Sequence, residues 1–399
     1  MAKVAIVGGA GHVGIPLALS FTHAGHDVLI HDVNRAALDC LRSGGVPFRE
    51  EGAAWLLKEA LDTRRISFSE EPGSIAGYEN VVITIGTPVD EFLNPEHRPI
   101  KACLDSLSPH IQTDALLVIR STVYPGTTEW VQRYFGNSVR VAFCPERTVQ
   151  GNGIEEIKKL PQLIGACSDV ADMRASGLFS TICAKTISLA PIEAELAKLF
   201  ANAYRYIEFA TTNKFYMMAT DAGADYQKIL AAMKTEYARC NIPGPGFAAG
   251  PCLFKDTMQL AALDGNSFGL GHEAMRINEG LVLWTVERLK KICDLKNSTV
   301  GILGMAFKAE SDDTRSSLSY KLKKVLQREA GEVLTTDPYV NDHSLESVNL
   351  TWLLDRADVL VLATPHNEYK GIKFSKPIVN VWGTPPEKPS LREEIARVL

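Results

Sequence analysis

The chain has 399 residues, of which 46% are hydrophobic, and carries 42 basic against 47 acidic side chains, a formal net charge of −5. A single hydrophobic core stops growing at roughly 250–300 residues, so we expect two or three domains. Basic and acidic residues are interspersed, without a basic stripe that would neutralise a phosphate backbone or an anionic membrane surface. This pattern argues against nucleic acid and membranes as partners.

The start of the sequence and its cysteines indicate where the protein works. The first residues lead directly into the strand-like pattern KVAIVGG, without the basic and apolar regions of a signal peptide. No apolar run approaches the roughly 20 residues of a membrane-spanning helix. The eight cysteines are scattered, without the spacings of a disulfide framework or a zinc site. We therefore expect a soluble, unprocessed protein of the reducing cytoplasm that binds no metal.

Short β-branched runs alternate with helical stretches through the first half of the chain. The runs are VAIVG at 4–8, HDVLIHD at 26–32, NVVITIGTP at 80–88, ALLVIRSTV at 115–123 and RVAFCPE at 140–146. Such alternation predicts βαβ units, and hence a parallel sheet covered by helices on both faces.

A long helix is predicted next, over residues 193–221. This segment contains no Pro or Gly and places apolar residues at 196, 199, 200, 203, 207 and 210, in helical spacing. An Ala-Gly pair at 222–223 is a plausible stop. About 29 helical residues span roughly 43 Å at 1.5 Å per residue, longer than a small domain is wide. The helix should therefore bridge two domains.

A second alternating region repeats the first in the same order. VGILG corresponds to VAIVG, GEVLTTD to HDVLIHD, and VLVLATP to VVITIGTP. We therefore predict an α/β fold with two Rossmann-like, doubly wound parallel sheets joined by a helical middle with one long bridging helix. The predicted domains are residues 1–190, 191–293 and 294–399. The alternative is that any two parallel sheets share such strings.

A glycine-rich turn follows the first predicted strand and opens a helix. In Gly9-Ala-Gly11-His-Val-Gly14, the first glycine permits a tight turn, the second lets the backbone approach a pyrophosphate, and the third allows close helix packing. The helix N-terminus offers amides to the phosphates. Asp32 ends the next strand, where an acid accepts hydrogen bonds from ribose hydroxyls and favours NAD over NADP. Arg35 lies close enough to weaken that preference.

The corresponding turn of the second region departs from this pattern. Gly301 and Gly304 are followed by MAFK, without a third glycine, so we expect no dinucleotide there. Charged residues crowd this turn instead, as a site for another phosphorylated ligand requires: Lys308, Asp312, Asp313 and Arg315. A solvated charged loop is the alternative.

The segment NIPGPGFAAGPCLFKD presents Cys252 and, one helical turn later, Asp256. Its small residues let backbone amides come near a ligand, and thiolate chemistry needs an accessible, partly polar setting. Lys198 and Asn202 share a face of the predicted long helix, where a cation and an amide would stabilise an oxyanion. The ordinary alternatives are a buried cysteine and a lysine exposed on a helix surface.

Seven motifs in family order, from about residue 1 to residue 340, resemble the UDP-glucose/GDP-mannose dehydrogenase family of nucleotide-sugar 6-dehydrogenases. They are GAGHVG, RSTVYPGTT, CPERTVQG, EAELAKLFANAYR, RCNIPGPGFAAGPCLFKD, GMAFKAESDDTRSS and TTDP. The resemblance implies a four-electron oxidation of the sugar C6 alcohol to a carboxylate, with two NAD consumed. In that scheme Cys252 forms a thiohemiacetal with the C6 aldehyde, the second oxidation gives a thioester, and water releases the acid.

The resemblance also implies roles for single residues. Lys198 and Asn202 match oxyanion-stabilising residues, Asp256 matches an aspartate of water and proton transfer, and Thr122 and Glu146 match residues that position water. The implied cofactor residues are Gly9, Gly11, His12, Val13, Gly14, Asp32, Thr87, Thr122 and Arg315. The implied substrate residues are Glu146, Lys198, Asn202, Arg239, Phe247, Gly250, Cys252 and Lys308. Arg239 resembles an arginine that reaches the partner's substrate across a dimer interface, so we expect a homodimer.

Departures from the family pattern bear on the substrate. Ala248-Ala249 replace the paired glycines of many members, and Asn213-Lys214 replace a frequent Asn-Glu. CPERTVQG is nearer the branches acting on N-acetylhexosamine nucleotides, whereas CLFKD is nearer the UDP-glucose branch. The sequence therefore ranks UDP-glucose, giving UDP-glucuronate, slightly ahead of a UDP-N-acetylhexosamine, with dTDP-glucose and GDP-mannose behind. A two-electron dehydrogenase of the hydroxyacid or 6-phosphogluconate type and a catalytically silent nucleotide-sugar sensor are the alternatives.

Overall fold

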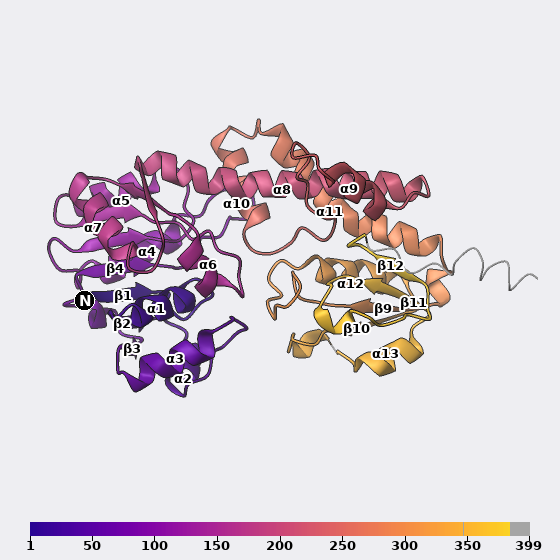
Figure 1. The fold of residues 1–399 in the computed structure, drawn as a ribbon, viewed down its shortest axis with the longest axis horizontal. Helices are drawn as coiled ribbons and strands as arrows, with labels where there is room; N and C mark the ends of the chain where they lie inside the picture. The colour runs from indigo at the N-terminus through magenta and orange to yellow at the C-terminus, as the bar shows by residue number, and fades with distance from the viewer. Residues whose placement is uncertain (346, 384–399) are drawn as a thin grey trace, which may run out of the picture. The chain divides into compact units, whose positions relative to one another are not determined.

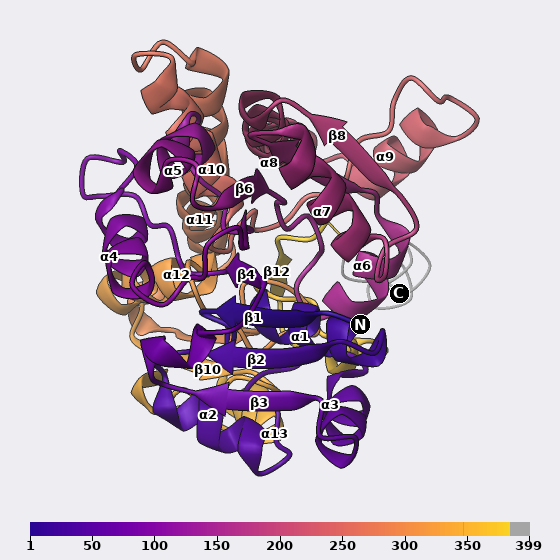
Figure 2. The same ribbon diagram turned by 90° about the vertical axis from the view of Figure 1, so that its left-hand side faces the viewer.

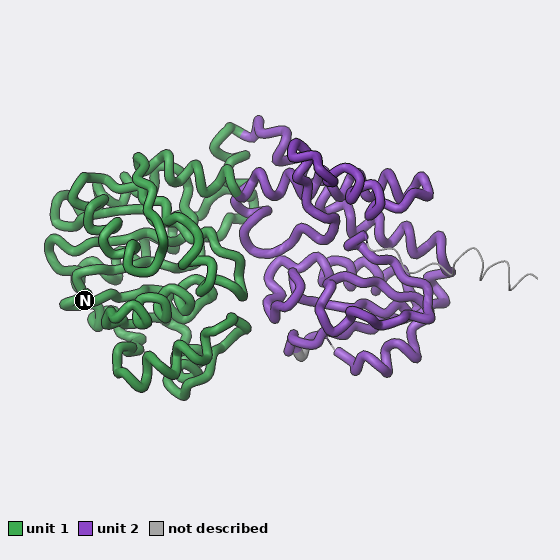
Figure 3. Tube along the Cα trace, viewed as in Figure 1, with its two compact units in different colours: residues 1–201, 258–265 green, residues 202–257, 266–399 purple. Residues whose placement is uncertain are grey.

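The computed structural model describes residues 1–345 and 347–383. Residues 384–399 of the predicted C-terminal domain therefore lie outside the described residues. The chain forms two compact units, which Figure 3 colours separately. Unit 1 comprises residues 1–201 and 258–265, and unit 2 comprises residues 202–257 and 266–399.

An eight-stranded sheet with the order β3-β2-β1-β4-β5-β6-β7-β8 forms the centre of unit 1 (Figure 2). The strands are β1 (Lys3–Val7), β2 (Asp27–His31), β3 (Ile66–Ser69), β4 (Asn80–Ile83), β5 (Leu116–Ile119), β6 (Arg140–Phe143), β7 (Gln162–Ala166) and β8 (Thr186–Leu189). The first six follow the doubly wound order of dinucleotide-binding sheets. All five strands expected in this region are confirmed, but β7 runs antiparallel to β6, so the sheet is parallel everywhere except at this pair.

Helices cover both faces of this sheet. Side chains of β1 alternate, so that Val4 and Ile6 pack in one core and Ala5 and Val7 in the other. The first core is covered by α1 (Gly14–His23), α2 (Arg35–Arg42), α3 (Ala53–Asp62), α6 (Gly153–Lys159) and α7 (Asp169–Phe179), and the second by α4 (Arg98–Leu107) and α5 (Thr127–Phe135) (Figure 1). Residues near the carboxyl ends of the strands are thereby held on a rigid base.

The predicted long helix is confirmed as α8 (Pro191–Asp221), a single helix of 31 residues that contributes to both units. It begins two residues before the predicted range because proline, with its fixed φ, is well suited to the first helical position. Buried Glu195 fixes its first turn to the start of α5. Its carboxylate accepts hydrogen bonds from the backbone N–H of Gly126 at 2.6 Å and from the hydroxyl of Thr128 at 2.6 Å.

A second sheet, of four parallel strands, forms the centre of unit 2. Its strands are β9 (Thr299–Leu303), β10 (Glu332–Thr336), β11 (Val359–Leu362) and β12 (Ile378–Asn380), in the order β10-β9-β11-β12. This order repeats β2-β1-β4-β5 of the first sheet, which confirms the repeat seen in the sequence.

The helices of unit 2 pack on this second sheet from both faces. One face is covered by the end of α8 with α9 (Tyr226–Lys234), α11 (Gly269–Lys290) and α12 (Leu318–Glu329), and the other by α13 (Leu350–Arg356). Helix α10 (Leu253–Leu263) begins directly after Cys252. Short 3-10 turns occur at Pro72–Ile75, Leu295–Asn297, His343–Leu345 and Asn367–Tyr369.

Candidate active site

The glycine-rich turn lies between β1 and α1, and its three glycines differ in what surrounds them. A Cβ atom on Gly14 would lie 2.4 Å from the Cα of Gly9, and one on Gly9 would lie 2.7 Å from the carbonyl oxygen of Ile6. A Cβ on Gly11 would meet only the carbonyl oxygen of Gly8, at 3.7 Å. The first two glycines are therefore required by packing, whereas Gly11 leaves open surface beside the backbone.

Asp32 holds this turn from the end of β2. One carboxylate oxygen accepts a hydrogen bond from the backbone N–H of Ala10 at 2.9 Å, and the other from that of Asn34 at 2.9 Å. His12, in the turn, lies with its Nδ1 atom 2.6 Å from Nε2 of Gln150. Open backbone at Gly11, the N-terminus of α1 and an anionic acceptor at the end of the next strand together fit a dinucleotide.

Three more predicted residues of unit 1 follow the ends of adjacent strands. Thr87, Thr122 and Glu146 come after β4, β5 and β6, whose carboxyl ends meet at one edge of the sheet. The structure brings the first two together, since the hydroxyl of Thr87 donates to the backbone carbonyl of Thr122 at 2.5 Å. Open α/β sheets bind their ligands at this edge.

Glu146 is paired with a buried arginine, Arg120, which no motif of the sequence marks as a site residue. Nη2 of Arg120 lies 2.6 Å from Oε2 of Glu146, and Arg120 is only 2% exposed. A second guanidinium nitrogen donates to Gln162 at 2.8 Å. The other oxygen of Glu146 accepts hydrogen bonds from the backbone N–H groups of Arg147 and Thr148, at 2.7 and 2.8 Å.

These contacts decide the ionisation of Glu146. Burial by itself raises the pKa of this carboxyl, but the positive charge of Arg120 and the hydrogen bonds from Thr148 outweigh it, so that the pKa lies below its ordinary value of 4.5. Glu146 is thus an anion near neutral pH, and both of its oxygens accept hydrogen bonds. The only trace of this pair in the sequence is the arginine of RSTV.

In unit 2 the structure places two of the predicted catalytic residues in direct contact. The side-chain amide of Asn202 donates to Oδ2 of Asp256 at 2.6 Å, and Asp256 is fully buried. Nζ of Lys255 lies 3.2 Å from Oδ1, the oxygen that accepts no hydrogen bond within the described part of the chain. Cys252 is exposed and lies one helical turn before Asp256. The residue with the exposed thiol therefore lies one helical turn before a buried carboxylate that a buried amide binds.

Lys198 lies on α8 one turn before Asn202. It is 8% exposed, so the alternative of a lysine exposed on a helix surface is wrong. A buried ammonium keeps its electrostatic effect because little water screens it. Helix α8 thus presents a cation and an amide in the relation that the sequence predicted.

The predicted substrate residues of unit 2 lie in the loop before Cys252 and in the turn after β9. Phe247 is buried, and a Cβ on Gly250 would lie 2.7 Å from the ring of Phe307, the neighbour of Lys308. Arg239 is exposed in the segment after α9, with its guanidinium 5.5 Å from the ring centre of Tyr237. The loop and the turn are therefore in contact, whereas Arg239 is directed to solvent.

Arg315, predicted to bind the cofactor, forms a bidentate ion pair with Asp313, with the shortest contact at 2.7 Å. Burial lowers the pKa of this guanidinium, but the hydrogen bonds and charge of Asp313, together with the negative charge of Cys252, raise it overall. The Arg315 guanidinium is therefore held by Asp313 and lies close enough to Cys252 for an electrostatic interaction.

The second glycine turn is closed by the protein itself. Asp337 directly follows β10 as Asp32 follows β2, and its Oδ2 atom accepts hydrogen bonds from the backbone N–H groups of Met305 at 2.6 Å and Ala306 at 3.0 Å. The same oxygen lies 3.1 Å from Nε2 of the fully buried His366. A carboxylate of the chain thus occupies the amides that open the turn.

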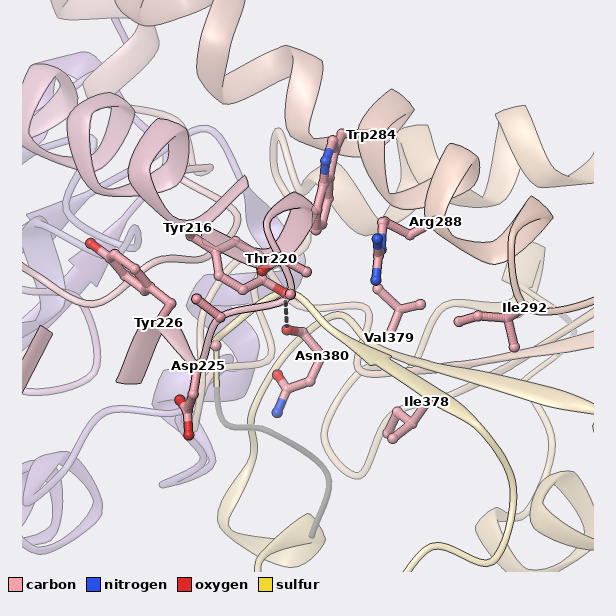
Figure 4. A pocket seen from close by; sticks show the side chains of 13 residues that line it. Tyr216, Thr220, Asp225, Tyr226, Trp284, Arg288, Ile292, Ile378, Val379 and Asn380 are labelled. Atoms are coloured by element: carbon pink, nitrogen blue, oxygen red, sulfur yellow. Dashed lines mark hydrogen bonds between the residues drawn. The ribbon is translucent and has the colours of Figure 1, made fainter. Parts of the chain in front are cut away.

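A cavity of about 260 Å³ lies elsewhere in unit 2, between the end of α8, α11 and β12 (Figure 4). Arg288 at its wall lies 3.6 Å from the carboxylate of Asp221, and the hydroxyl of Tyr216 donates to the carbonyl of Asn380 at 2.8 Å. None of the residues predicted for catalysis or ligand binding lines this cavity.

Within the described ranges, no helix has the length and apolar character needed to cross a membrane. The chain matches three domains of the UDP-glucose/GDP-mannose dehydrogenase family in order. Residues 2–183 match the NAD binding domain, 192–279 the central domain and 301–383 the UDP binding domain.

Similar proteins cover almost the whole chain. The UDP-N-acetyl-D-mannosamine dehydrogenase of Pyrococcus horikoshii is 29% identical, with 93% of this chain and 91% of the relative covered. A solved structure of UDP-D-ManNAc dehydrogenase from the same organism has a TM-score of 0.90 at 26% identity and covers 98% of this chain and 97% of its own. A UDP-glucose dehydrogenase from Pyrobaculum islandicum has a TM-score of 0.89 at 27% identity, with 98% and 96% covered. The chain belongs to the UDP-glucose/GDP-mannose dehydrogenase family and is an NAD-dependent nucleotide-sugar dehydrogenase.

Proposed function

We propose that the protein oxidises the C6 hydroxymethyl group of a UDP-linked hexose to a carboxylate in two steps, through a thioester on Cys252. The observation that carries this proposal is the hydrogen bond between Asn202 and Asp256, one turn after the exposed thiol. A two-electron dehydrogenase has no use for such a thiol, whereas acyl transfer to water requires a nucleophile and a group that handles protons.

The residues of the chain divide this chemistry between them. The glycine turn at Gly9, Gly11 and Gly14, with Asp32, would hold NAD, which would supply the hydride acceptor for both oxidations of C6. The ammonium of Lys198 and the amide of Asn202 stabilise the negative oxygen on C6. The sulfur of Cys252 adds to the aldehyde carbon, the second oxidation leaves a thioester, and water then breaks the carbon–sulfur bond. Asp256 takes the proton of that water, and the thiol is released with the free acid.

Water positioning is proposed for Thr122 and Glu146. Because Arg120 and two backbone amides bind both oxygens of Glu146, we assign it a positioning role by its negative charge rather than the role of proton acceptor. Arg315, whose guanidinium is fixed by its ion pair with Asp313, is assigned to the surroundings of Cys252, with which it interacts electrostatically.

For the substrate, we infer a UDP-N-acetylhexosamine, with UDP-glucose as the second candidate. Relatives that cover more than nine-tenths of the chain are named UDP-N-acetyl-D-mannosamine dehydrogenases, and the loop CPERTVQG points to the same branch. CLFKD and the structural similarity to the Pyrobaculum islandicum enzyme favour UDP-glucose. With these relatives as support, we rank the two candidates in the reverse of the order that the sequence favoured.

The direct test is to incubate the enzyme and NAD with a panel of nucleotide sugars and to measure NADH formed per sugar consumed. Two NADH per sugar support the proposal, one indicates a two-electron dehydrogenase, and none indicates a silent sensor. Cys252→Ser should abolish acid formation. Cys183→Ser, which alters a thiol in unit 1 that donates to the carbonyl of Lys185, is the matched control and should leave the ratio at two.

We infer further that the enzyme is a homodimer. Helix α8 exposes large apolar side chains, with Tyr204 63%, Phe215 42% and Met218 58% exposed, and Arg239 is free to reach a partner's substrate. Phe215→Glu should produce a monomer in sedimentation velocity, whereas Trp352→Glu, on α13, should not. A wild type that sediments as a monomer and is fully active contradicts this inference.

Two broader inferences complete the proposal. The chain is organised as domains 1–190, 191–293 and 294–399, of which the first binds NAD and the last the nucleotide. It works in the reducing cytoplasm, which its eight free cysteines support.

A further inference from the structure

Asn213 lies on α8, beyond the residues assigned to the chemistry, and is fully buried. Its side-chain amide binds both backbone groups of Gly246, in the loop before Cys252. The Nδ2 atom donates to the carbonyl of Gly246 at 2.9 Å, and the N–H of Gly246 donates to Oδ1 at 2.8 Å. The side-chain amide of Asn213 thus satisfies both the donor and the acceptor of one backbone residue of the loop, as the backbone of a neighbouring β-strand would.

A second buried asparagine fixes the orientation of this amide. Nδ2 of Asn213 also donates to Oδ1 of Asn278, on α11, at 2.9 Å, and Nδ2 of Asn278 donates to the carbonyl of Tyr206 at 3.0 Å. Because Gly246 presents both a donor and an acceptor, only one orientation of Asn213 satisfies the network. Asn278 therefore locks Asn213 in the orientation that the loop needs.

The loop is confined on its other side by aromatic rings. Gly246 has a φ of +151°, and a Cβ there would lie 2.3 Å from the ring of Trp382. Gly250 has a φ of +96°, and a Cβ there would lie 2.7 Å from the ring of Phe307. Residues 247–249 lie between these two fixed points, and their N–H groups donate no hydrogen bond to other described residues. They remain available to a ligand.

Helix α8 thereby holds the nucleophile segment on both sides of Cys252. Asn213 binds Gly246 before the thiol, and Asn202 binds Asp256 after it. One rigid helix therefore sets the position of the loop amides and of the carboxylate at the same time. Fixing a loop before its ligand arrives removes the cost of ordering it from the binding step.

We propose that Asn213, locked by Asn278, is a positioning residue that orders loop 246–250 for the diphosphate and places Cys252 for attack. This inference rests on the proposed function, because it assigns the loop to the nucleotide and the thiol to catalysis. Without the amide, the peptide groups of Gly246 are buried and unpaired, and the loop must shift to reach water or other partners.

The test compares Asn213→Ala and Asn278→Ala in the full-length enzyme with Thr212→Val as control. Thr212 is the preceding residue of α8, is fully buried and shares one hydrogen bond of 2.7 Å with Tyr226, away from the loop. The measurements are the Kd of UDP by calorimetry, KM and kcat for the nucleotide sugar, the rate of Cys252 alkylation by iodoacetamide, the Kd of NAD, and Tm.

Asn213→Ala should raise the Kd of UDP and the KM of the sugar at least about tenfold, and reduce kcat/KM by roughly 100-fold, as expected for a small misplacement of reacting groups. It should also change the alkylation rate, and leave the Kd of NAD unchanged. Asn278→Ala keeps both hydrogen bonds between Asn213 and Gly246, so its changes in Kd and KM should be smaller and in the same direction. If Asn213→Ala does not fold, the Asn278→Ala variant tests the inference in its place. Thr212→Val should lower Tm without changing KM or the Kd of UDP.

The inference is overturned if the asparagine variants bind UDP and turn over as wild type does, or if Thr212→Val shows the same kinetic loss at a similar Tm. Failure of the proposed function is separate, because then wild type itself oxidises no nucleotide sugar. In that case the UDP titrations still decide whether Asn213 orders the loop.

Discussion

The glycine turn between β1 and α1 offers a test in which stability and cofactor binding change independently. In Gly14→Ala, the new methyl carbon would lie 2.4 Å from the Cα and 2.5 Å from the carbonyl oxygen of Gly9, against the 3.5–4.0 Å, roughly, of ordinary carbon contacts. Both neighbours are backbone atoms, so the strand and the helix must separate by about 1 Å.

The expected cost follows from two opposing effects. Overpacking costs about 1–3 kcal/mol, towards the upper end when backbone must move, and alanine in a helix returns about 0.5–1 kcal/mol relative to glycine. A net loss of about 2 kcal/mol lowers Tm by roughly 4–8 °C in a unit of about 200 residues. NAD binding should weaken as well, because the turn that receives the pyrophosphate is displaced.

Gly11→Ala is the matched variant with the opposite expectation for stability. Its methyl group meets one atom at 3.7 Å, and alanine restricts the unfolded chain by about 0.4–1 kcal/mol, so Tm should stay constant or rise. The methyl nevertheless stands where the pyrophosphate approaches, and the Kd of NAD should rise at least tenfold, about 1.4 kcal/mol. Differential scanning fluorimetry and NAD titration decide both points. A wild-type Tm for Gly14→Ala, or a wild-type Kd for Gly11→Ala, refutes the reasoning.

Three further predictions concern the carboxylates. Arg120→Met leaves the buried Glu146 carboxylate unpaired and should lower the free energy of unfolding by about 3–5 kcal/mol, measured by urea unfolding. Adding Glu146→Gln to this variant should restore part of that free energy. An Arg120→Met variant as stable as wild type contradicts the buried pair. Because the folded pKa of Glu146 lies below its ordinary value of 4.5, its stabilisation is present above that pH and is lost as the pH falls through the folded pKa. The Tm difference between wild type and Glu146→Gln should therefore shrink below about pH 4.5, and a difference that stays constant to pH 3.5 rules this out. Asp256→Asn should give a burst of NADH, followed by steady turnover at least about 100-fold slower than that of wild type. Asp264→Asn, at an exposed position, is the control. Slow turnover without a burst would assign Asp256 to an oxidation step instead.

Much of the fold could be predicted because buried parallel strands are short apolar runs whose order in the chain limits their arrangement. The strands from β1 to β6 that were expected, and β9, β10 and β11 of the second sheet, come from such runs. The strand β3 reads ISFS and is half exposed, and β8 reads TISL with partly exposed residues. Nothing in their composition separates them from loops, and the antiparallel direction of β7 depends on the tertiary pairing alone.

The site was predictable where residue type and spacing carry the signal, and not where long-range partners do. Lys198 and Asn202 stood out by their spacing on one helix face. The contact of Asn202 with Asp256, and that of Arg120 with Glu146, join residues far apart in the chain. The sequence drew attention to the Asn213-Lys214 pair only because Lys214 departs from the family pattern. A single asparagine on a helix gives no indication of what its side chain binds.

The carboxylate of Asp337 has a consequence for competition between ligands. A group tethered within the chain acts at an effective concentration of about millimolar or more, and the cell cannot deplete it or wash it away. Free diphosphates therefore face a permanent competitor for the amides of Met305 and Ala306, whereas no such competitor covers the open backbone at Gly11. Two sheets with the same strand order thus remain distinguishable to the cofactor, because Asp337 binds two successive amides of its turn, whereas Asp32 binds the amide of Ala10 and leaves the backbone at Gly11 open.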